Sequence, residues 1–367
     1  MRILAAPDSF KGSLTAERFC KIINQAAKRA LADFECVSMP LADGGEGTAS
    51  LVAKALDGTL EKIEVEGPTG KPVKAHIAFV NGGKTAVIES AQAIGLSLAG
   101  RRTNPIRTSS YGVGQMISYA TSKGAGEIVL TLGGSCTNDL GAGMLSAMGV
   151  SFVDICGNRF SPIGGSLERV ETVEFNQAFS KYREVKFVIL CDVDNPLLGE
   201  NGCARVFAPQ KGAGASDILR LEHGAKKFAG VVRRVTGTDE INTPGAGAAG
   251  GIGFGALSFL EAERKSGIEA MFEIYNFKKA AALSDLIITG EGRFDRQSFM
   301  GKAVGGVLGE RGDVPAVVFC GSTDGVEVPE GVTVIPISDG LDLEYAMAEA
   351  SNLLLSAAEK YFNSLKK

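Results

Sequence analysis

The chain has 367 residues, a length that predicts two domains rather than one. Its 38 basic and 42 acidic residues give a formal net charge of −4, which argues against nucleic acid and against an anionic membrane as partners. The chain contains 45% hydrophobic residues, a share typical of folded proteins. It has only 2 histidines, so neither a multi-histidine zinc site nor a Ser-His-Asp relay is expected.

Glycine is the most unusual part of the composition. The chain has 48 glycines in 367 residues, whereas a share of roughly 7% is usual. We therefore expect backbone groups to contribute much of the ligand binding. The 7 cysteines include no C-x-x-C pair, and Asp8 interrupts the start of any signal-peptide core. Both observations favour reduced thiols in a cytoplasmic protein.

The first part of the chain predicts two strand-loop-helix units. Residues 3–6 are apolar and predict a strand, and a segment with one apolar helical face follows, with Thr15 as its expected N-cap. A second strand is expected at residues 36–39, before a glycine-rich loop at residues 43–48 and another helix. Because the unit repeats, it favours a parallel sheet.

After residue 67 the pattern changes. Two β-rich stretches, at residues 73–80 and 85–90, flank the sequence Asn81-Gly82-Gly83, and Asn-Gly is a strong hairpin signal. A hairpin interrupts the alternation of strands and helices, so a domain boundary is expected near Gly67.

The alternation returns later in the chain. Strands are expected at residues 128–132, 187–191, 286–289, 316–319 and 332–337, before a C-terminal amphipathic helix. If the last three strands complete the sheet that begins at Ile3, the middle of the chain is an insertion. We therefore assign residues 1–67 and 280–367 to one discontinuous domain and residues 68–279 to the inserted domain. Two crossings between domains imply a hinge and a cleft.

Of two glycine motifs found in nucleotide-binding proteins, the sequence contains one and lacks the other. The pattern G-x-x-x-x-G-K-[ST] does not occur, which excludes a P-loop site. The pattern G-x-G-x-x-G occurs at residues 245–250, but residues 241–244 before it do not predict a strand. Within the uncharged run 241–260, the glycines therefore favour a loop followed by a closely packed helix over a dinucleotide site.

Five polar segments combine the residue types that bind anions and metals. Backbone N–H groups, hydroxyls and Lys or Arg suit anionic substrates, and carboxylates suit Mg²⁺. Each segment alone is more often a cap or a turn, but together they meet the needs of phosphoryl transfer, which depends on positioning and charge stabilisation. Four of the five follow predicted strands, where open α/β sheets bind ligands. The segments are residues 8–13, 133–139, 191–196, 210–212 and 290–295.

With these segments in view, the chain closely resembles the glycerate kinase family, type I, the bacterial enzymes that phosphorylate glycerate with ATP. The resemblance runs essentially from end to end, with mild departures at Cys136, Leu140 and Ser298. It is carried by residues 6–12, 42–48, 133–143, 191–199, 210–213 and 244–253, and by residues 289–293 with Asp295 and Gln297.

The resemblance implies an α/β fold in which a Rossmann-like parallel-sheet domain carries an inserted second α/β domain, with a ligand cleft between them. It also implies the reaction of ATP with D-glycerate to give ADP and phosphoglycerate, with 2-phosphoglycerate favoured over 3-phosphoglycerate. ATP and Mg²⁺ are then the expected cofactors, with Mg²⁺ bridging the β- and γ-phosphates. No nucleic acid or membrane partner is expected, and a homodimer is left open.

That reaction suggests catalytic roles for four residues. Lys11 and Arg293 are expected to offset charge on the transferred phosphoryl group. Asp8 is the first candidate for the base near the substrate hydroxyl, and Asp43 is the second.

Metal and substrate roles are assigned to further residues. Asp192 and Glu291 are the candidate Mg²⁺ ligands, with Asp194 and Asp295 in reserve. We expect the 133–139 loop, which the sequence places at a helix start, to hold an anionic group, either nucleotide phosphate or the glycerate carboxylate. The residues assigned to substrate or nucleotide binding are Ser9, Gly133, Gly134, Ser135, Thr137, Asn138, Lys211 and Gly290.

Two other functions stay open at this point. The motif at residues 245–250 would suit an NAD(P)-dependent oxidoreductase of a hydroxy acid. A hinged two-domain α/β chain would also suit a non-catalytic sugar-acid sensor, although no helix-turn-helix appendage supports it. Release of ADP, rather than a change in nicotinamide absorbance or binding without turnover, would distinguish the kinase from both.

Overall fold

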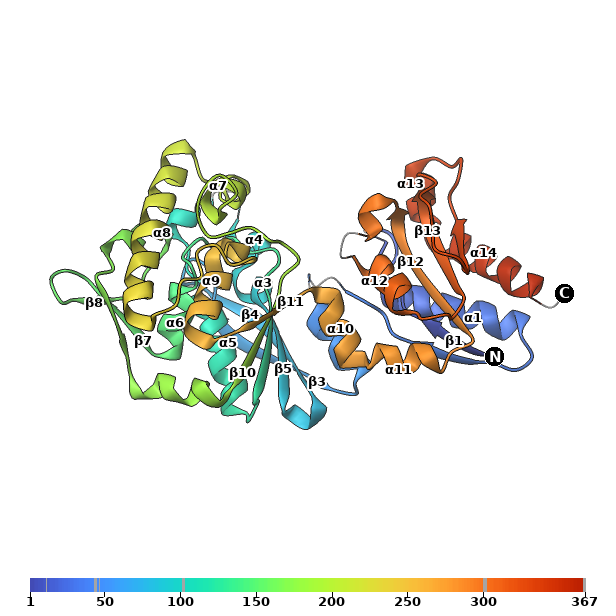
Figure 1. Ribbon diagram of the computed structural model, residues 1–367, viewed down its shortest axis with the longest axis horizontal. Helices are drawn as coiled ribbons and strands as arrows, with labels where there is room; N and C mark the ends of the chain where they lie inside the picture. The colour runs from blue at the N-terminus through green and yellow to red at the C-terminus, as the bar shows by residue number, and fades with distance from the viewer. Residues whose placement is uncertain (11, 43–44, 46, 101–102, 300–301, 366–367) are drawn as a thin grey trace. The chain divides into compact units, whose positions relative to one another are not determined.

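The structure, a computed structural model, describes every residue except 11, 43–44, 46, 101–102, 300–301 and 366–367. The chain divides into two compact units. Unit 1 comprises Met1–Asp43 and Ser266–Lys367, and unit 2 comprises Gly44–Lys265. Unit 2 is thus inserted into unit 1, and both units combine helices with parallel strands (Figure 1). The predicted fold class is confirmed.

Unit 1 is built on a five-stranded parallel sheet with the strand order β14-β13-β12-β1-β2. Ile3 pairs with Leu286, so strands from the two ends of the chain lie side by side. The late strands therefore complete the sheet that begins near the N-terminus, as predicted. The strands are β1 (Arg2–Ala5), β2 (Glu35–Ser38), β12 (Leu286–Phe294), β13 (Ala316–Thr323) and β14 (Val332–Pro336).

Helices cover both faces of this sheet. Successive residues of a strand point to opposite faces, and Ile3 packs in an apolar cluster with Phe19 of α1 and Leu354 of α14. The helix α12 contacts β12 outside that cluster (Figure 1). Thr15 caps α1 as expected, since its side chain accepts a hydrogen bond from the N–H of Arg18. The helices and 3₁₀ turns (η) are α1 (Ala16–Ala30), α10 (Gly267–Tyr275), α11 (Phe277–Ala282), η6 (Arg296–Phe299), α12 (Ala303–Glu310), α13 (Leu343–Ala348) and α14 (Ala350–Ser364).

Unit 2 contains a six-stranded sheet with the order β11-β10-β6-β5-β4-β3. The four strands from β11 to β5 are parallel, and β4 is antiparallel to both of its neighbours. The hairpin predicted around Asn81 is confirmed by the pairing of β4 with β5. The strands are β3 (Thr59–Glu66), β4 (Pro72–Val80), β5 (Thr85–Glu89), β6 (Glu127–Thr131), β10 (Lys186–Leu190) and β11 (Glu263–Lys265), and a smaller antiparallel sheet consists of β7 (Val150–Val153), β8 (Arg159–Phe160) and β9 (Thr172–Phe175).

One large apolar core supports unit 2. Ile128 of β6 belongs to the same cluster of buried residues as Val113 of α5 and Phe228 of α8. The core thus joins the central strand to helices from both halves of the unit. The helical segments are α2 (Thr48–Ala55), η1 (Asn81–Gly83), α3 (Ser90–Ile94), α4 (Leu96–Ala99), η2 (Pro105–Arg107), α5 (Tyr111–Ser122), α6 (Ala142–Met148), η3 (Gly164–Arg169), η4 (Gln177–Glu184), α7 (Cys203–Phe207), η5 (Pro209–Lys211), α8 (Ala215–Thr236) and α9 (Ala248–Leu260).

The limits of the two units differ from the predicted domain limits at both crossings. The prediction assigned residues up to 67 to the first domain, but β3 pairs with β4 from Thr59 to Glu66 and so belongs to the sheet of unit 2. It also assigned residues 266–279 to the insertion, but α10 belongs to unit 1, where the hydroxyl of Tyr275 donates to the carbonyl of Pro40. Pairing with distant strands and helices, rather than local composition, sets these limits.

The glycines at residues 245–253 allow close packing, as the sequence suggested. Residues 241–247 form turns rather than a strand, so the structural context of a dinucleotide fingerprint is missing. Gly250 has φ +67°, and a Cβ there would lie 2.0 Å from the carbonyl oxygen of Thr137. A Cβ on Gly253 would lie 2.1 Å from the carbonyl oxygen of Gly245. Gly250 therefore lets α9 approach the 133–139 loop, and Gly253 lets it pack against the turn at Gly245.

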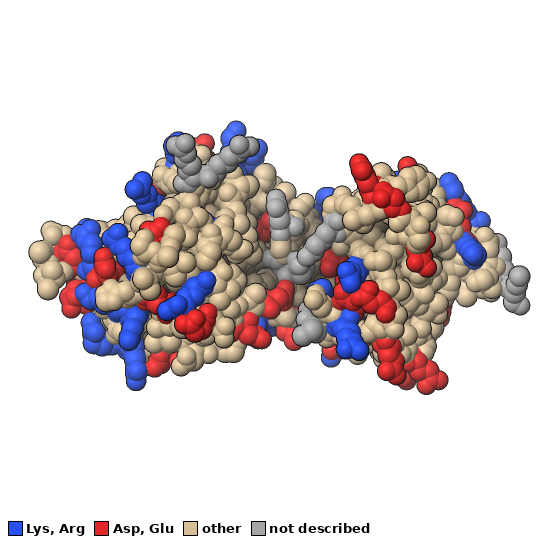
Figure 2. Space-filling view, turned by 90° about the horizontal axis from the view of Figure 1, so that it is seen from above, with Lys and Arg blue, Asp and Glu red and all other residues tan. Residues whose placement is uncertain are grey.

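The remaining sequence expectations concern thiols and surface charge. All seven cysteines are free thiols, and most of them are buried. Within the described residues, no helix combines the length and the apolar character needed to cross a membrane. On the face shown in Figure 2, basic and acidic side chains are interspersed over unit 2 rather than separated by sign.

Candidate functional site

The predicted site residues fall into two groups, one in each unit. Lys11 and Asp43 lie outside the described residues. Unit 1 contains Asp8, Ser9, Gly290, Glu291 and Arg293, and unit 2 contains Gly133, Gly134, Ser135, Thr137, Asn138, Asp192 and Lys211.

In unit 2, the loop at residues 133–139 follows β6. The N–H of Cys136 donates to the carbonyl of Ile94 at 2.8 Å, and the N–H of Leu96 donates to the carbonyl of Gly134 at 3.0 Å. These two bonds hold the loop against the end of α3. Gly133 and Gly134 are exposed, so the first part of the loop lies at the surface.

The loop does not lie at the start of a helix, so that part of the prediction is wrong. The helix α6 begins at Ala142, after Gly141, and the polar residues up to Asn138 precede it. The N–H of Cys136 is also already bonded. A helix dipole therefore does not favour an anion at this loop, and the groups left to donate to one are its side chains and the exposed backbone of Gly133 and Gly134.

Lys211 reaches the loop from η5, 76 positions along the chain from Ser135. Its Nζ donates to the Oγ of Ser135 at 3.1 Å and to the carbonyl of Thr137 at 2.7 Å. Only 3% of Lys211 is exposed. The fold thus brings a buried ammonium group to residues that the sequence placed on separate segments.

Burial determines the charge state of Lys211. It lowers the pKa of the ammonium to about 8, because a charged group is costly to remove from water. Cys203, Cys136 and Asp139 act in the opposite direction on that pKa. Lys211 therefore titrates near physiological pH, unlike an exposed lysine.

Three consecutive residues of the loop carry buried polar atoms without a hydrogen-bond partner. These are the Oγ1 of Thr137, the Oδ1 of Asn138 and the Oδ1 of Asp139. A buried, unsatisfied polar atom costs about 1–3 kcal/mol. Three such atoms in sequence indicate that the loop is built to meet a further polar group.

Asp139 is a buried carboxylate of the loop that was not among the predicted site residues. Its Oδ2 accepts hydrogen bonds from the N–H of Ser110 at 2.7 Å, from the hydroxyl of Ser110 at 2.9 Å and from the N–H of Gly143 at 3.2 Å. Burial raises the pKa of the Asp139 carboxyl, while the bonds from Ser110 lower it. Asp139 thus ties the loop to the starts of α5 and α6. It lies inside the polar segment, but residue types alone do not separate it from its neighbours.

Glu89 is a second position that the sequence analysis missed. It is 2% exposed, and its carboxylate accepts from the N–H groups of Gly47 at 3.2 Å and Ala49 at 2.7 Å. These groups lie at the start of α2, where helices otherwise attract anions. The Glu89 carboxylate therefore occupies the position at the start of α2 where an anionic ligand could otherwise bind. Glu89 ends an apolar strand and carries no motif that would have marked it.

The acids that follow β10 have different surroundings. Asp194 forms an ion pair with Arg264 at 2.5 Å, so its charge is already balanced. Asp192 is exposed, and Cys191 before it is buried. Asp192 and Asp194 both stay predictions as metal ligands.

In unit 1, the predicted loop at residues 290–295 is wrong, because β12 continues to Phe294. The strand extends because Glu291 and Arg293 still pair with residues of β13. Gly290 makes this packing possible, since a Cβ there would lie 2.3 Å from the carbonyl oxygen of Phe319. Glu291 and Arg293 are therefore held by a sheet rather than by a loop.

Asp8 lies beside this strand. Its N–H donates to the carbonyl of Gly290 at 2.9 Å, which continues the pairing of β1 with β12 beyond the end of β1. The N–H of Ser9 donates to the Oδ1 of Asp8 at 2.6 Å. The backbone of Gly290 thus positions Asp8, and both Asp8 and Ser9 are half-buried.

Glu291 is a buried carboxylate in an acidic environment. It is 7% exposed, and its Oε1 has no hydrogen-bond partner. Burial raises the pKa of the Glu291 carboxyl; Ser298 and Lys302 lower it, and the nearby charges of Asp8 and Asp295 raise it further. The end of β12 therefore gathers several carboxylates around one atom that lacks a partner.

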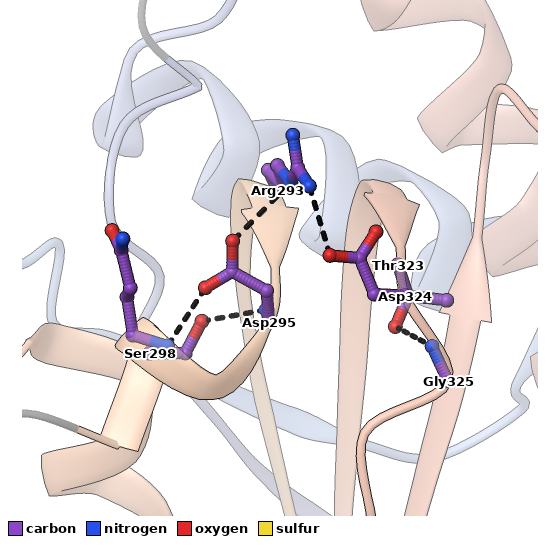
Figure 3. Close-up of polar contacts among 7 residues, drawn as sticks. Arg293, Asp295, Ser298, Thr323, Asp324 and Gly325 are labelled. Atoms are coloured by element: carbon purple, nitrogen blue, oxygen red, sulfur yellow. Dashed lines mark hydrogen bonds and ion pairs between the residues drawn. The ribbon is translucent and has the colours of Figure 1, made fainter.

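Arg293 is already engaged with two acids. Its guanidinium contacts Asp295 at 3.2 Å and Asp324 at 2.8 Å (Figure 3). Both contacts raise the pKa of Arg293, Asp324 more than Asp295. Asp295 is itself fixed, because its N–H donates to the Oγ of Ser298 at 3.0 Å. Contact of Arg293 with a phosphoryl group would require it to exchange one of these partners.

In the part of the chain that the structure describes, no group of three or more His, Cys, Asp or Glu residues could by itself hold a metal ion.

Comparisons with known proteins agree with one another. The chain matches the family model described as the glycerate kinase family over residues 3–366. It is 38% identical over 366 residues to the glycerate kinase of Halalkalibacterium halodurans, which covers 97% of this chain and 96% of the relative. It is 40% identical over 332 residues to the glycerate 2-kinase of Escherichia coli (strain K12), covering 89% and 87% of the two chains. A crystal structure from Salmonella typhimurium LT2, provisionally assigned as glycerate kinase 2, superposes with a TM-score of 0.91 at 33% identity, over 100% of this chain and 98% of that chain.

Proposed function

Because the chain belongs to the glycerate kinase family, we propose that it transfers the γ-phosphoryl group of ATP to D-glycerate, giving ADP and phosphoglycerate. The match of the family model over residues 3–366 is the observation that carries this proposal. The two groups of polar residues, one in each unit, supply the charges that such a reaction needs. The relative from Escherichia coli is named a glycerate 2-kinase, which supports 2-phosphoglycerate as the product.

The residues at the end of β12 fit a magnesium ion. Mg²⁺ prefers oxygen ligands and usually takes one or two carboxylates together with phosphate oxygens. Glu291 offers a buried Oε1 without a partner, and Asp8 and Asp295 lie near it. When bound, the ion would neutralise charge on the β- and γ-phosphates. We propose Glu291 as the ligand in unit 1, and Asp192 as the candidate in unit 2.

We assign binding of an anionic group to the 133–139 loop. The exposed backbone of Gly133 and Gly134 and the hydroxyl of Ser135 would donate to oxygens of the substrate. The buried Oγ1 of Thr137 has no partner and could donate as well, whereas the buried Oδ1 of Asn138 can only accept, so Asn138 would bind an anion through its Nδ2. Lys211 supplies the positive charge behind them. Donors of this kind act best where charge develops in the transition state.

The other residues of unit 1 would act on the reacting groups. We propose Asp8 as the base that receives the proton of the attacking hydroxyl, since the Gly290 carbonyl fixes its backbone. Ser9 is proposed to bind phosphate oxygens. Arg293 is proposed to stabilise the transferred group after exchanging a carboxylate partner. Lys11, as a second such cation, and Asp43, as an alternative base, stay predictions.

Phosphorus NMR tests the reaction and its regiochemistry together. The purified full chain is incubated with ATP, MgCl₂ and D-glycerate, and the product is compared with authentic 2-phosphoglycerate and 3-phosphoglycerate. We expect ADP and 2-phosphoglycerate. Formation of 3-phosphoglycerate would overturn the regiochemistry alone, and no glycerate-dependent release of ADP would overturn the proposed function. Replacing Mg²⁺ with EDTA is the matched control, and it should abolish turnover.

A further inference from the structure

We propose that Lys211 acts through Ser135: its ammonium group occupies the acceptor side of the Ser135 hydroxyl and so fixes that hydroxyl as a hydrogen-bond donor to an anionic oxygen of a substrate. The inference rests on the proposed function and deepens it. It makes Lys211 a positioning residue, whereas Ser135 makes the contact with substrate.

The direction of the hydrogen bond follows from the chemistry of the two groups. An ammonium group has three donors and no acceptor. At 3.1 Å from Lys211 Nζ, the Oγ of Ser135 must therefore accept. A hydroxyl has one proton of its own, and among the described residues the Ser135 hydroxyl forms no hydrogen bond other than the one from Lys211. That proton is left to point to a ligand.

The hydrogen bonds of the two residues, rather than their burial, separate their roles, because Lys211 is 3% exposed and Ser135 is 4% exposed. Lys211 donates a second bond to the carbonyl of Thr137 at 2.7 Å, so the ammonium is used within the protein. Ser135 keeps its own proton and directly follows Gly133 and Gly134, which are exposed. A substrate at this surface would meet the loop, with the lysine behind it. Because a hydroxyl that accepts from a cation is polarised, it becomes a stronger donor.

The same arrangement predicts a dependence on pH. The titratable groups that act on Lys211 are Cys136 and Asp139 of the loop and Cys203 of α7. Burial lowers the pKa of Lys211 to about 8. Above that pH the neutral amine has a lone pair and can accept the Ser135 proton. The hydroxyl then turns away from the substrate, and the anion is held less tightly.

Calorimetric titration of the full-length protein with D-glycerate and, separately, with ADP tests the proposal. One of these two ligands should place an anionic oxygen at the Ser135 hydroxyl. For that ligand, we expect the wild-type dissociation constant to rise above about pH 8. Lys211→Met and Ser135→Ala should each weaken that ligand by about tenfold to a hundredfold at pH near 7. The ligand that responds identifies the source of the anion as glycerate or nucleotide.

The double variant Lys211→Met/Ser135→Ala is the decisive sample. If Lys211 acts through Ser135, the double variant should bind no more weakly than either single variant. A loss equal to the product of the two single losses would show that Lys211 contacts the substrate itself, and it would overturn the proposal. Ser135→Thr, which keeps a hydroxyl, should retain the rise above about pH 8.

Two controls keep the result independent of folding and of the proposed function. Thermal unfolding of each variant shows whether it is folded. If Lys211→Met does not fold, the wild-type and Ser135→Thr titrations still decide the question, since constant affinity up to about pH 9.5 would overturn the proposal. A protein that binds glycerate as expected but makes no phosphoglycerate would contradict the proposed function and leave this inference standing.

Discussion

The two groups of site residues differ in the sign of their charge. In unit 2 the 133–139 loop receives the buried ammonium of Lys211, and Asp139 beside it accepts hydrogen bonds from Ser110 and Gly143 through Oδ2, while its Oδ1 has no partner. In unit 1 Glu291 lies near other carboxylates and has an oxygen without a partner. The first group suits the oxygens of an anionic substrate and the second suits a cation. Phosphoryl transfer needs both kinds of group.

The largest expected effect tests the acidic group. Glu291→Gln removes the proposed metal ligand but keeps the size of the side chain, so kcat should fall roughly a thousandfold, or about 4 kcal/mol. Because burial raises the pKa of Glu291, removing its charge should not lower the melting temperature. Steady-state kinetics at varied Mg²⁺ and a thermal melt measure both effects. Glu327→Gln, at an exposed position of unit 1, is the control and should behave as wild type.

The second effect tests the buried cation through stability. The folded pKa of Lys211 is about 8 and its usual value is 10.5, so between these values the unfolded chain binds more protons. The free energy of unfolding of wild type, relative to Lys211→Met, should therefore rise by about 3 kcal/mol as the pH increases from about 8 to 10.5. Denaturant titrations at several pH values measure it. For the control Lys226→Met, at an exposed position, the difference in unfolding free energy from wild type should not change with pH. An equal change with pH for both variants would contradict a buried charge at Lys211.

The third effect tests whether Asp139 holds the loop. Asp139→Ala removes the acceptor of three hydrogen bonds, while it also relieves the cost of burying a carboxylate. We expect the free energy of unfolding to fall by about 2 kcal/mol. Asp139→Asn keeps an acceptor oxygen and should lose less. Chemical denaturation compares them, and an asparagine variant as unstable as the alanine variant would show that charge, not hydrogen bonding, matters here.

The smallest effect concerns the exposed ion pairs. Asp324→Asn leaves Arg293 with Asp295 as its partner, and the side chains of Arg293 and Asp324 are 63% and 61% exposed. Stability should change by less than about 1 kcal/mol, because water screens such pairs. Asp194→Asn, which removes the partner of Arg264, is the matched variant in unit 2. A large loss of activity in Asp324→Asn alone would show that the pair orders Arg293 for the reaction.

Much of the fold and part of the candidate site could be predicted from the sequence. Apolar runs and helical periodicity indicated the strands of the unit 1 sheet, the hairpin at Asn81 and the Thr15 cap, because these features depend on neighbouring residues. In the six-stranded sheet of unit 2 they indicated β4, β5, β6 and β10 but missed β3 and β11. The polar segments also indicated which stretches of chain carry the chemistry. The resemblance along these segments indicated the family, which the family model confirms over residues 3–366.

Tertiary structure alone decided how those residues are used. Pairing with β13 extends β12 through Glu291 and Arg293, and pairing with β4 assigns β3 to unit 2. Contacts between distant positions join Lys211 to Ser135 and Asp324 to Arg293. The physical reason is that helical and strand periodicity depends on residues that are close together in the sequence. The burial of a charged side chain, and the partner that it contacts, depend instead on which distant segments the fold brings together.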